Sequence, residues 1–548
     1  MSLALKPTEQ NGNDVPRQAS PFLTGASLAS MEVETVAEIS FKLPSPEYRA
    51  YTWILQDEHT PASQTPLIAS TRGPLGALDS GVVPNTIQIN GYNYQKAGSP
   101  APFGRLQEPQ TVDDLVRWRR EWIPQVEELA QRLESFDPCS VPPGSWANTL
   151  EELSRENQRV FSGVHSTAVG PARMAVDKFA NAYVQYFGDS RRQDALALVQ
   201  GFPNLSVERA SALWELSRLA RQNPDLRAAF ETKSYSTAYS SSLEEFKDKL
   251  SELLNRFGST SNNGKQDEPT WREDPWIPLE LVLRYAEQDD QSNPAIAAER
   301  QHERRLVLER ELHVLAYRDA TVAAMIPLLD IAQQFLPNLE DHNLLADQRL
   351  HYASRKRWLA IGDYLVNKGH LASPEDVFYY TYQELLSLLE GASPLGQDVI
   401  ANRRHVQELY RSTTPPATLG KPPEQDVSLS SNPSATGRGY VLKGVAASPG
   451  TYTATARIID SLEDIHRLNR GDILVCRSTT PPWSPFFAIA GAIVTNTGGA
   501  LSHGAVVARE FGIPAVVGLR DATSLIPDGI TVTIDGGKGL VVVGLGPE

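Results

Sequence analysis

The chain has 548 residues and a formal net charge of −15, with 41% hydrophobic and 21% charged residues. This composition excludes disordered, collagen-like and disulfide-scaffold proteins, and the length corresponds to about three or four average domains. The negative charge argues against a broad nucleic-acid-binding surface, and no apolar run reaches the ~20 residues of a membrane span. The N-terminal residues lack a secretion-signal pattern. We therefore expect a cytoplasmic protein with neither nucleic acid nor a membrane as partner.

The cysteine content is low. The two cysteines, Cys139 and Cys476, are accompanied by no CxxC motif and no Cys/His pair. Structural zinc and a disulfide framework are therefore not expected, and the sequence predicts no metal ligands.

Helical patterns dominate the first three quarters of the chain. Residues 1–105 predict irregular structure with a few strands, for example at 51–55 and 86–90. Thr111 is a plausible helix N-cap with acidic residues in the first turn behind it. The polar residues 258–273 predict an exposed loop. Amphipathic helices are expected at residues 145–165, 172–200, 205–222, 240–257, 277–291, 294–337, 340–369 and 381–411.

One of these helices carries ionisable residues on a mixed face. At helical spacing this face comprises Val307, Glu311, Val314 and Arg318, flanked by Arg310 and His313. Burying a charge is costly unless it is paired, so Glu311 and Arg318 either pair or face a cavity. The alternative is a solvated helix edge with an ordinary salt bridge.

A change of composition predicts a domain boundary. Residues 412–437 are rich in Pro, Ser and Thr without apolar periodicity, which is typical of a semi-extended linker; an ordinary surface loop is the alternative. Residues 438–548 hold 9 Lys and Arg, 9 Asp and Glu, and 16 of the 37 glycines, so the whole net charge lies before them. Their β-branched runs between turns predict a compact α/β domain, with strands at 453–459, 472–475, 492–495, 515–517, 530–534 and 540–543.

The most informative pattern lies between two of these strands. A glycine-rich turn after Thr495 lets backbone approach a ligand closely, and a helix follows with His503 in its first turn. Free N–H groups and the helix dipole there attract a phosphoryl group, so His503 is a candidate for covalent catalysis through a phosphohistidine. The alternative is a histidine that merely caps a turn. The candidate phosphate-positioning residues are Thr497, Gly498, Gly499 and Ser502, the last placed as the N-cap.

Residues 497–518, TGGALSHGAVVAREFGIPAVVG, resemble the phosphohistidine signature of the phosphoenolpyruvate-utilising enzymes. This family includes pyruvate phosphate dikinase, phosphoenolpyruvate synthase, rifampin phosphotransferase and phenylphosphate synthase. The resemblance implies that His503 is the phosphate carrier of a swivelling domain. Gly504 departs from the pattern, because relatives commonly carry Ala or Thr there, and it should loosen the start of the helix slightly.

The resemblance extends to the helical part. Residues 359–385 resemble the end, and residues 53–61 the opening, of the acceptor domain in rifampin phosphotransferase and phenylphosphate synthase. Arg310-Glu311 resembles a pair that lines the acceptor site of the antibiotic phosphotransferases. The implied base is Glu311 or His313, with Arg310 or Arg318 stabilising charge. The implied architecture is a mostly α-helical acceptor-binding domain with a small mixed β region (1–411), a linker (412–437) and a compact α/β swivelling phosphohistidine domain (438–548).

The family resemblance also implies a partner. Relatives place an ATP-grasp region before the acceptor domain, and residues 1–105 lack the length and the Gly/Lys loops for one. We therefore expect a separate ATP-grasp subunit that uses ATP and Mg²⁺ to phosphorylate His503. The resemblance is strongest to the larger subunits of the split synthases of phenylphosphate and 4-methylphenyl phosphate.

The acceptor implied by that resemblance is a small phenol such as 4-methylphenol, which would give an aryl phosphate, AMP and phosphate. Two alternatives remain. One is a component of a rifampin-type antibiotic or alcohol phosphotransferase, which would need a large apolar groove. The other is a non-catalytic phosphohistidine relay protein that passes the group to another protein.

Overall fold

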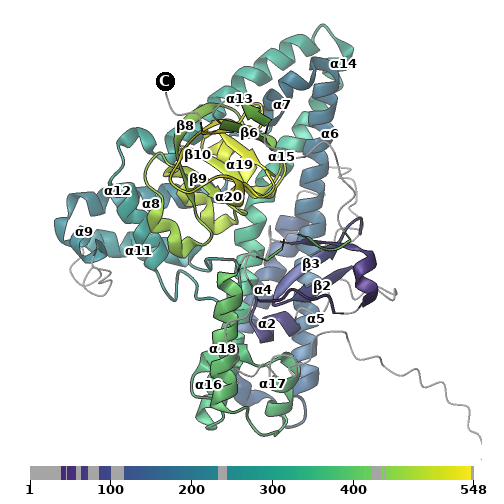
Figure 1. The fold of residues 1–548 in the computed structure, drawn as a ribbon, viewed down its shortest axis with the longest axis vertical. Helices are drawn as coiled ribbons and strands as arrows, with labels where there is room; N and C mark the ends of the chain where they lie inside the picture. Colours follow the sequence, from purple (N-terminus) through teal and green to yellow (C-terminus); the bar gives the residue numbers. More distant parts are fainter. Residues whose placement is uncertain are drawn as a thin grey trace, which may run out of the picture.

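A computed structural model describes two main bodies with a small sheet beside them (Figure 1). The helical body comprises residues 117–413, and the C-terminal domain comprises residues 439–544. Thr111 and most of residues 53–61 lie outside the described residues. The structure describes residues 39–44, 46–56, 63–71, 85–99, 117–231, 244–413, 415–416, 418–421, 434–436 and 439–544.

The helical body follows the predicted amphipathic segments, with breaks where polar caps intervene. The long helix expected at 294–337 is interrupted, because the Asp319 carboxylate accepts hydrogen bonds from the N–H groups of Thr321 and Val322 and starts a new helix. The helices are α4 (Ile123–Glu134), α5 (Trp146–Val164), α6 (Gly170–Phe187), α7 (Arg192–Leu198), α8 (Leu205–Gln222), α9 (Pro224–Glu231), α11 (Glu244–Phe257), α12 (Trp276–Ala286), α13 (Pro294–Ala316), α14 (Ala320–Ala323), α15 (Ile326–His342), α16 (Arg349–Asn367), α17 (Tyr382–Leu389) and α18 (Gln397–Ser412).

Within the described residues, three short π-helical segments adjoin these helices. They are η2 (Trp118–Trp122), η4 (His165–Val169) between α5 and α6, and η7 (Asn343–Gln348) between α15 and α16. Each widens the backbone by a residue and turns neighbouring side chains away from the regular helical face. Such segments are frequent at functional sites.

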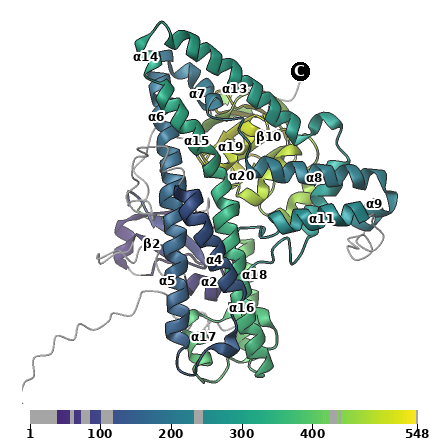
Figure 2. The same ribbon diagram turned by 180° about the vertical axis from the view of Figure 1, so that it is seen from behind.

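The long helices α6, α13 and α15 line one side of the C-terminal domain, and α8, α9, α11 and α12 form a lobe on the other (Figures 1 and 2). Helices α15 and α6 pack along each other around a core that includes Phe179, Leu329 and Phe335. Helices α4, α5 and α16 to α18 extend away from the C-terminal domain. The C-terminal domain is thus held between two parts of the helical body.

The segment at residues 258–273, expected to be an exposed loop, is largely buried. Thr260, Lys265 and Trp271 are each at most 2% exposed. The Lys265 ammonium donates to the Ser63 carbonyl at 2.9 Å, and the Asp267 carboxylate accepts from the Thr65 N–H at 3.0 Å. The expectation of exposure is wrong because the polar residues of this loop are partnered by a segment distant in sequence rather than by water.

A four-stranded sheet lies beside α4 and α5 (Figure 1). Its order is β2-β3-β1-β4, and all its pairs are antiparallel. The last strand lies within the stretch predicted to be a linker. The strands are β1 (Thr52–Leu55), β2 (Thr86–Ile89), β3 (Tyr92–Lys96) and β4 (Thr418–Gly420).

The C-terminal domain is built on one sheet of order β5-β6-β13-β12-β8-β9-β10-β11-β7. Strands β8 to β11 are parallel, and antiparallel strands flank them on both sides. The predicted fold class, a mostly helical domain followed by a compact α/β domain, is confirmed. The strands are β5 (Ser434–Thr436), β6 (Gly439–Lys443), β7 (Val445–Ser448), β8 (Thr451–Ile458), β9 (Ile473–Cys476), β10 (Ala492–Thr495), β11 (Ala515–Val517), β12 (Thr531–Asp535) and β13 (Leu540–Val543).

The two bodies share an apolar core. The 3₁₀ segment η11 (Pro481–Ala488) packs on α8, and its residues Trp483, Phe486 and Phe487 belong to the same buried cluster as Trp214 of the helical body. The Tyr285 hydroxyl donates to the Pro485 carbonyl at the centre of this contact. The docked arrangement is therefore stabilised by burial of apolar surface on both sides.

Among the described residues, one helical stretch, Ala320–Asn367, is long and apolar enough by length and composition to cross a membrane. A single helix of this kind is weak evidence of a membrane protein, because the core helix of a soluble protein passes the same test.

Candidate active site

His503 is the first residue of α19 (His503–Glu510), which follows the glycine-rich turn after β10. Gly498 has φ 108°, and a Cβ there would lie 2.8 Å from the Ser502 Oγ, so this turn requires glycine. Ser502 occupies the N-cap position, but its hydroxyl donates to the Gly499 carbonyl at 2.9 Å instead of capping the helix. Among the residues that the structure describes, no side-chain hydrogen bond caps this helix end, which begins at His503.

Both nitrogens of the His503 ring have partners, one from each body. Nδ1 lies 3.0 Å from the Glu340 Oε2 on α15, and Nε2 lies 3.0 Å from the Ser484 Oγ on η11. A carboxylate accepts hydrogen bonds, so Nδ1 donates to Glu340 and Nε2 is the nitrogen left beside a hydroxyl. Glu340 is 7% exposed and lies across the domain interface from the histidine it orients.

His503 borders a cavity of about 140 Å³ between the two bodies. The predicted residues Thr497, Gly498 and Ser502 line it as well, whereas Gly499 does not. The Gly499 carbonyl accepts from both the N–H and the hydroxyl of Ser502. The helical body supplies the opposite wall from η4, α6, α15 and η7, through His165, Val169, Gly170, Arg173, Leu339, Glu340, His342 and Asn343.

The cavity has a cationic and an apolar side. Arg173, in the first turn of α6, contributes a guanidinium group to the lining. Val169, Leu339 and Leu501 contribute apolar side chains. A cation beside an apolar surface suits a ligand that joins a small apolar group to an anion.

Gly504 has a structural role at this site. A Cβ at residue 504 would lie 2.4 Å from the Thr479 Oγ1, and Thr479 lines the cavity. The glycine therefore lets the Thr479 hydroxyl approach the start of α19. The departure from the family pattern fits this close approach.

Several known proteins are similar to parts of the chain, and three of them illustrate the range. Chondramide synthase cmdD of Chondromyces crocatus is 29% identical over 550 residues, which cover 91% of this chain and 14% of that protein. Rifampicin phosphotransferase of Bacillus cereus is 27% identical over 455 residues, 80% of this chain and 50% of that protein. Phosphoenolpyruvate synthase of Aeropyrum pernix is 44% identical over 126 residues, 23% of this chain and 14% of that protein. The chain thus spans half or less of the length of each.

Two family models match the two bodies that form the cavity. Residues 468–539 match the mobile domain of PEP-utilising enzymes, and residues 164–337 match the fourth domain of rifampicin phosphotransferase. The matched segments belong to the PEP-utilising phosphotransferase family. This confirms the family that residues 497–518 predict. The segment matched to the PEP-utilising mobile domain contains His503, and the segment matched to rifampicin phosphotransferase contains His165 and Arg173.

The residues to which the sequence resemblance assigned the acceptor site do not lie at this cavity. Arg310, Glu311 and His313 are exposed on α13, Arg318 is exposed in the turn after it, and none of the four lines the cavity. Val307 and Val314 on the same face are 51% and 57% exposed. The alternative interpretation, a solvated helix edge, describes this face, because the apolar contacts of α13 are made by the opposite side through Leu312.

Several residues that the sequence analysis missed form the wall opposite the PEP-utilising mobile domain. They include Glu340 and His342 at the end of α15, where an apolar helix turns polar after Pro337. Asn338, Glu340, Asp341 and His342 are all buried. Burying a run of polar residues is costly unless each has a function or a partner. The polar sequence NLEDH at 338–342, at the end of an apolar helix, could therefore have indicated a site. His165 and Arg173 carried no comparable signal, because only the packing of α6 on α15 brings them to the cavity.

Proposed function

We propose that this chain is the acceptor-binding and phosphoryl-carrying part of a phosphotransferase. His503 would carry a phosphoryl group and pass it to the hydroxyl of a small phenol such as 4-methylphenol, giving an aryl phosphate. The observation that carries this proposal is the position of His503 on the wall of a cavity whose other wall is the helical body. A carrier histidine that faces a small-molecule cavity is placed for transfer to a small molecule rather than to a protein.

The size of the cavity supports a small acceptor. Its volume is about 140 Å³, and an apolar protein cavity of about 150 Å³ binds benzene. The apolar side chains of Val169, Leu339 and Leu501 would contact a single aromatic ring. A bulky antibiotic would require a much larger opening between the two bodies.

The geometry indicates how the transfer would proceed. Because Nδ1 donates to Glu340, we infer that the phosphoryl group is carried on Nε2, where it would displace the Ser484 hydroxyl. The acceptor oxygen forms a bond to phosphorus while the P–Nε2 bond breaks and its electron pair returns to the ring. The hydroxyl proton of the acceptor ends on Nε2, so atoms and charge balance. Glu340 is a positioning residue in this scheme, since it acts through His503.

Charge on the transferring group needs stabilisation, because phosphoryl transfer depends mainly on positioning and electrostatics. Arg173 lies on the cavity wall and would pair with phosphoryl oxygens. Thr497, Gly498 and Ser502, which line the cavity, would hold further oxygens through the turn and the start of α19, whereas Gly499 would act only by shaping the turn. This proposal uses Arg173 in place of Arg310 and Arg318, and it leaves Glu311 and His313 without a role in the transfer.

The donor side of the reaction is part of the proposal. A separate ATP-grasp subunit with ATP and Mg²⁺ would phosphorylate His503 in the cytoplasm, with AMP and phosphate as by-products. The C-terminal domain (438–548) would move between that subunit and the acceptor-binding domain (1–411) about a linker at 412–437. The match of this chain to about half of a rifampicin phosphotransferase is compatible with such a division of labour.

The transfer step can be tested without the donor. Phosphoramidate phosphorylates imidazole groups chemically, so the purified chain is treated with it, desalted, and analysed by mass spectrometry for phosphate on His503. Addition of 4-methylphenol is expected to release that phosphate as an aryl phosphate, detected by ³¹P NMR. The control His405→Ala removes an exposed histidine and should behave like the wild type. Aryl phosphate formed equally well by His503→Ala would refute the proposal.

The alternatives give different outcomes in the same assay. A phosphate that stays on His503 with every phenol but moves to a second protein would identify a relay protein. Leu501→Trp fills the apolar side of the cavity, so it should raise the KM for 4-methylphenol while leaving the phosphate content of His503 unchanged. A variant that affected a large antibiotic acceptor but not the phenol would favour the antibiotic phosphotransferase.

A further inference from the structure

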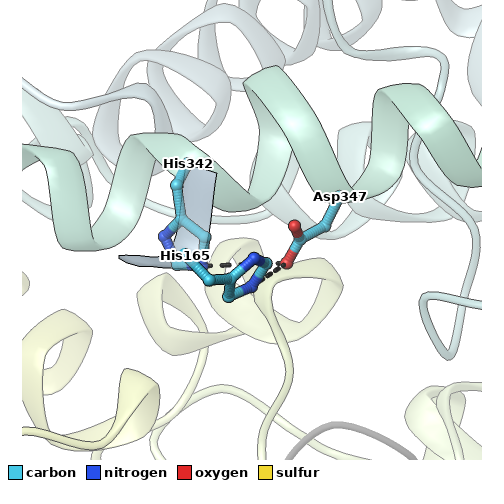
Figure 3. Close-up of side chains that lie close together, drawn as sticks. All are labelled: His165, His342 and Asp347. Carbon is cyan, nitrogen blue, oxygen red and sulfur yellow. Dashed lines mark ion pairs between the residues drawn. The ribbon is translucent and has the colours of Figure 1, made fainter. Parts of the chain in front are cut away.

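Three buried side chains converge beside the cavity. His165, His342 and Asp347 are 4%, 9% and 8% exposed, and one ligand atom from each lies within 4.8 Å of the others (Figure 3). The Asp347 Oδ2 is 3.5 Å from the His165 Nε2 and 3.7 Å from the His342 Nε2. Both distances exceed those of well-formed hydrogen bonds. The two imidazoles thus point at the same carboxylate oxygen.

The surroundings of His165 fix which of its nitrogens faces this cluster. Nδ1 lies 2.8 Å from the Phe161 carbonyl, which can only accept, so Nδ1 carries a proton. In the neutral ring Nε2 then presents its lone pair toward the Asp347 carboxylate, and two acceptors face each other. A histidine that binds a metal through one ring nitrogen commonly donates the N–H of its other ring nitrogen to a backbone carbonyl, as His165 does to Phe161.

The second oxygen of Asp347 supports the same interpretation. Oδ1 is buried and has no hydrogen-bond partner among the described residues. A buried carboxylate with an unsatisfied oxygen is costly unless a cation compensates its charge. The cluster is also assembled by both π-helical segments of this region, since His165 begins η4, His342 precedes η7 and Asp347 lies within it.

We propose that His165, His342 and Asp347 bind a divalent transition metal of the Zn²⁺ class, with at least one coordination position open toward the cavity. Two imidazoles and one carboxylate form a donor set common in catalytic zinc sites. Ligand atoms about 2.0–2.1 Å from a tetrahedral metal are about 3.3–3.4 Å apart. The separations of 3.5 and 3.7 Å are near this value, and all three ligand atoms lie within 4.8 Å of one another, so binding requires the side chains to draw together. The sequence predicts no metal ligands because these residues meet only in the folded chain.

The position of the site gives it a role, which depends on the transfer proposed above. His165 and His342 line the same cavity as His503. A cation there would coordinate the hydroxyl oxygen of an acceptor and make its proton easier to remove. The rival arrangement has no metal: burial lowers the pKa of His165, but the Asp347 carboxylate outweighs burial and raises it, which favours an imidazolium–carboxylate pair.

Metal binding is tested independently of phosphoryl transfer. The full chain, without a polyhistidine tag, is stripped with a chelator, dialysed against Zn²⁺ and analysed for bound metal. One equivalent is expected, together with a rise in Tm that the chelator reverses. Co²⁺ in place of Zn²⁺ should give visible absorption typical of a tetrahedral or five-coordinate site with nitrogen and oxygen ligands.

Variants separate the site from adventitious binding. Asp347→Asn keeps the side-chain shape, and we expect it to lower the affinity by about 100-fold or more, because even second-shell changes cost 10- to 100-fold. His342→Ala should abolish the Co²⁺ spectrum. His405→Ala, which changes an exposed histidine, and His503→Ala, which removes transfer, should both keep full binding. Substoichiometric metal in the wild type, or an unchanged spectrum in both ligand variants, would overturn the proposal even if transfer to phenol succeeds.

Discussion

A buried carboxyl group at the domain interface predicts that the docked structure weakens as the pH rises. Glu510, the last residue of α19, accepts a hydrogen bond from the Gly201 N–H of the helical body at 3.3 Å. Its second oxygen is buried and has no hydrogen-bond partner among the described residues. Burial raises the pKa of Glu510 to about 7, and nearby Glu340 adds to the rise, while Arg509 and Arg305 oppose it.

The sign and size of the effect follow from linkage. Between the ordinary pKa of about 4.5 and the native value of about 7, the native state binds more protons at Glu510 than the unfolded state. Stability therefore falls as the pH rises through this window, and the loss is complete above pH 7. A shift of about 2.5 units corresponds to about 3 kcal/mol.

Glu510→Gln removes the charge and keeps an oxygen that can accept from Gly201. We expect the variant to match the wild type near pH 5 and to be more stable by about 3 kcal/mol at pH 8. Denaturant unfolding at several pH values, with Tm measured in parallel, provides the comparison. Glu303→Gln on α13 is the control, because Glu303 is exposed. The reasoning fails if the difference between Glu510→Gln and the wild type does not depend on pH.

Three further predictions concern the site. Glu340→Gln removes the carboxylate that orients His503. It should slow single-turnover transfer by about 100-fold with little change in KM, because small misplacements of a reacting group cost this much in rate. An unchanged rate would show that Glu340 has no positioning role. Gly498→Ala places a Cβ at positive φ against Ser502, so it should destabilise the C-terminal domain by about 1–3 kcal/mol, measured as a lower Tm. Glu311→Gln combined with Arg318→Gln should change the transfer rate by no more than about twofold, because both residues face solvent; a large loss would return α13 to the acceptor site.

The sequence predicted the C-terminal domain well because its signals are local. The bounds of β10, β11 and β13 coincide with the predicted strands, since β-branched runs are delimited there by Gly, Pro and Asn. The helix after Ser502 begins where the turn ends, as expected. What local chemistry could not give was the partner of Ser502, whose hydroxyl bonds within the turn.

The cavity wall opposite His503 was predicted poorly because it is assembled by long-range packing. Glu340 meets His503 across 163 positions of sequence, and no pattern at either residue indicates the other. His165 and Asp347 meet because two helices lose their regular repeat at η4 and η7, and helical periodicity assumes that repeat. The mixed face of α13 could not be assigned for the same reason. Its spacing places Glu311 and Val314 together, but only packing decides whether a helix face is covered, and here Val314 is exposed.

The aromatic residues of η11 oppose any movement of His503 away from the helical body. Trp483, Phe486 and Phe487 are at most 3% exposed in the shared core, and exposing a large apolar side chain costs about 1.5–3 kcal/mol. A departing C-terminal domain would present these side chains to water. The undocked form would then be rare and short-lived, unless the surface of a donor subunit buried these aromatic side chains again. If a donor subunit acts as proposed, its surface and the helical body would compete for the same aromatic segment. That competition would govern how often His503 reaches the donor.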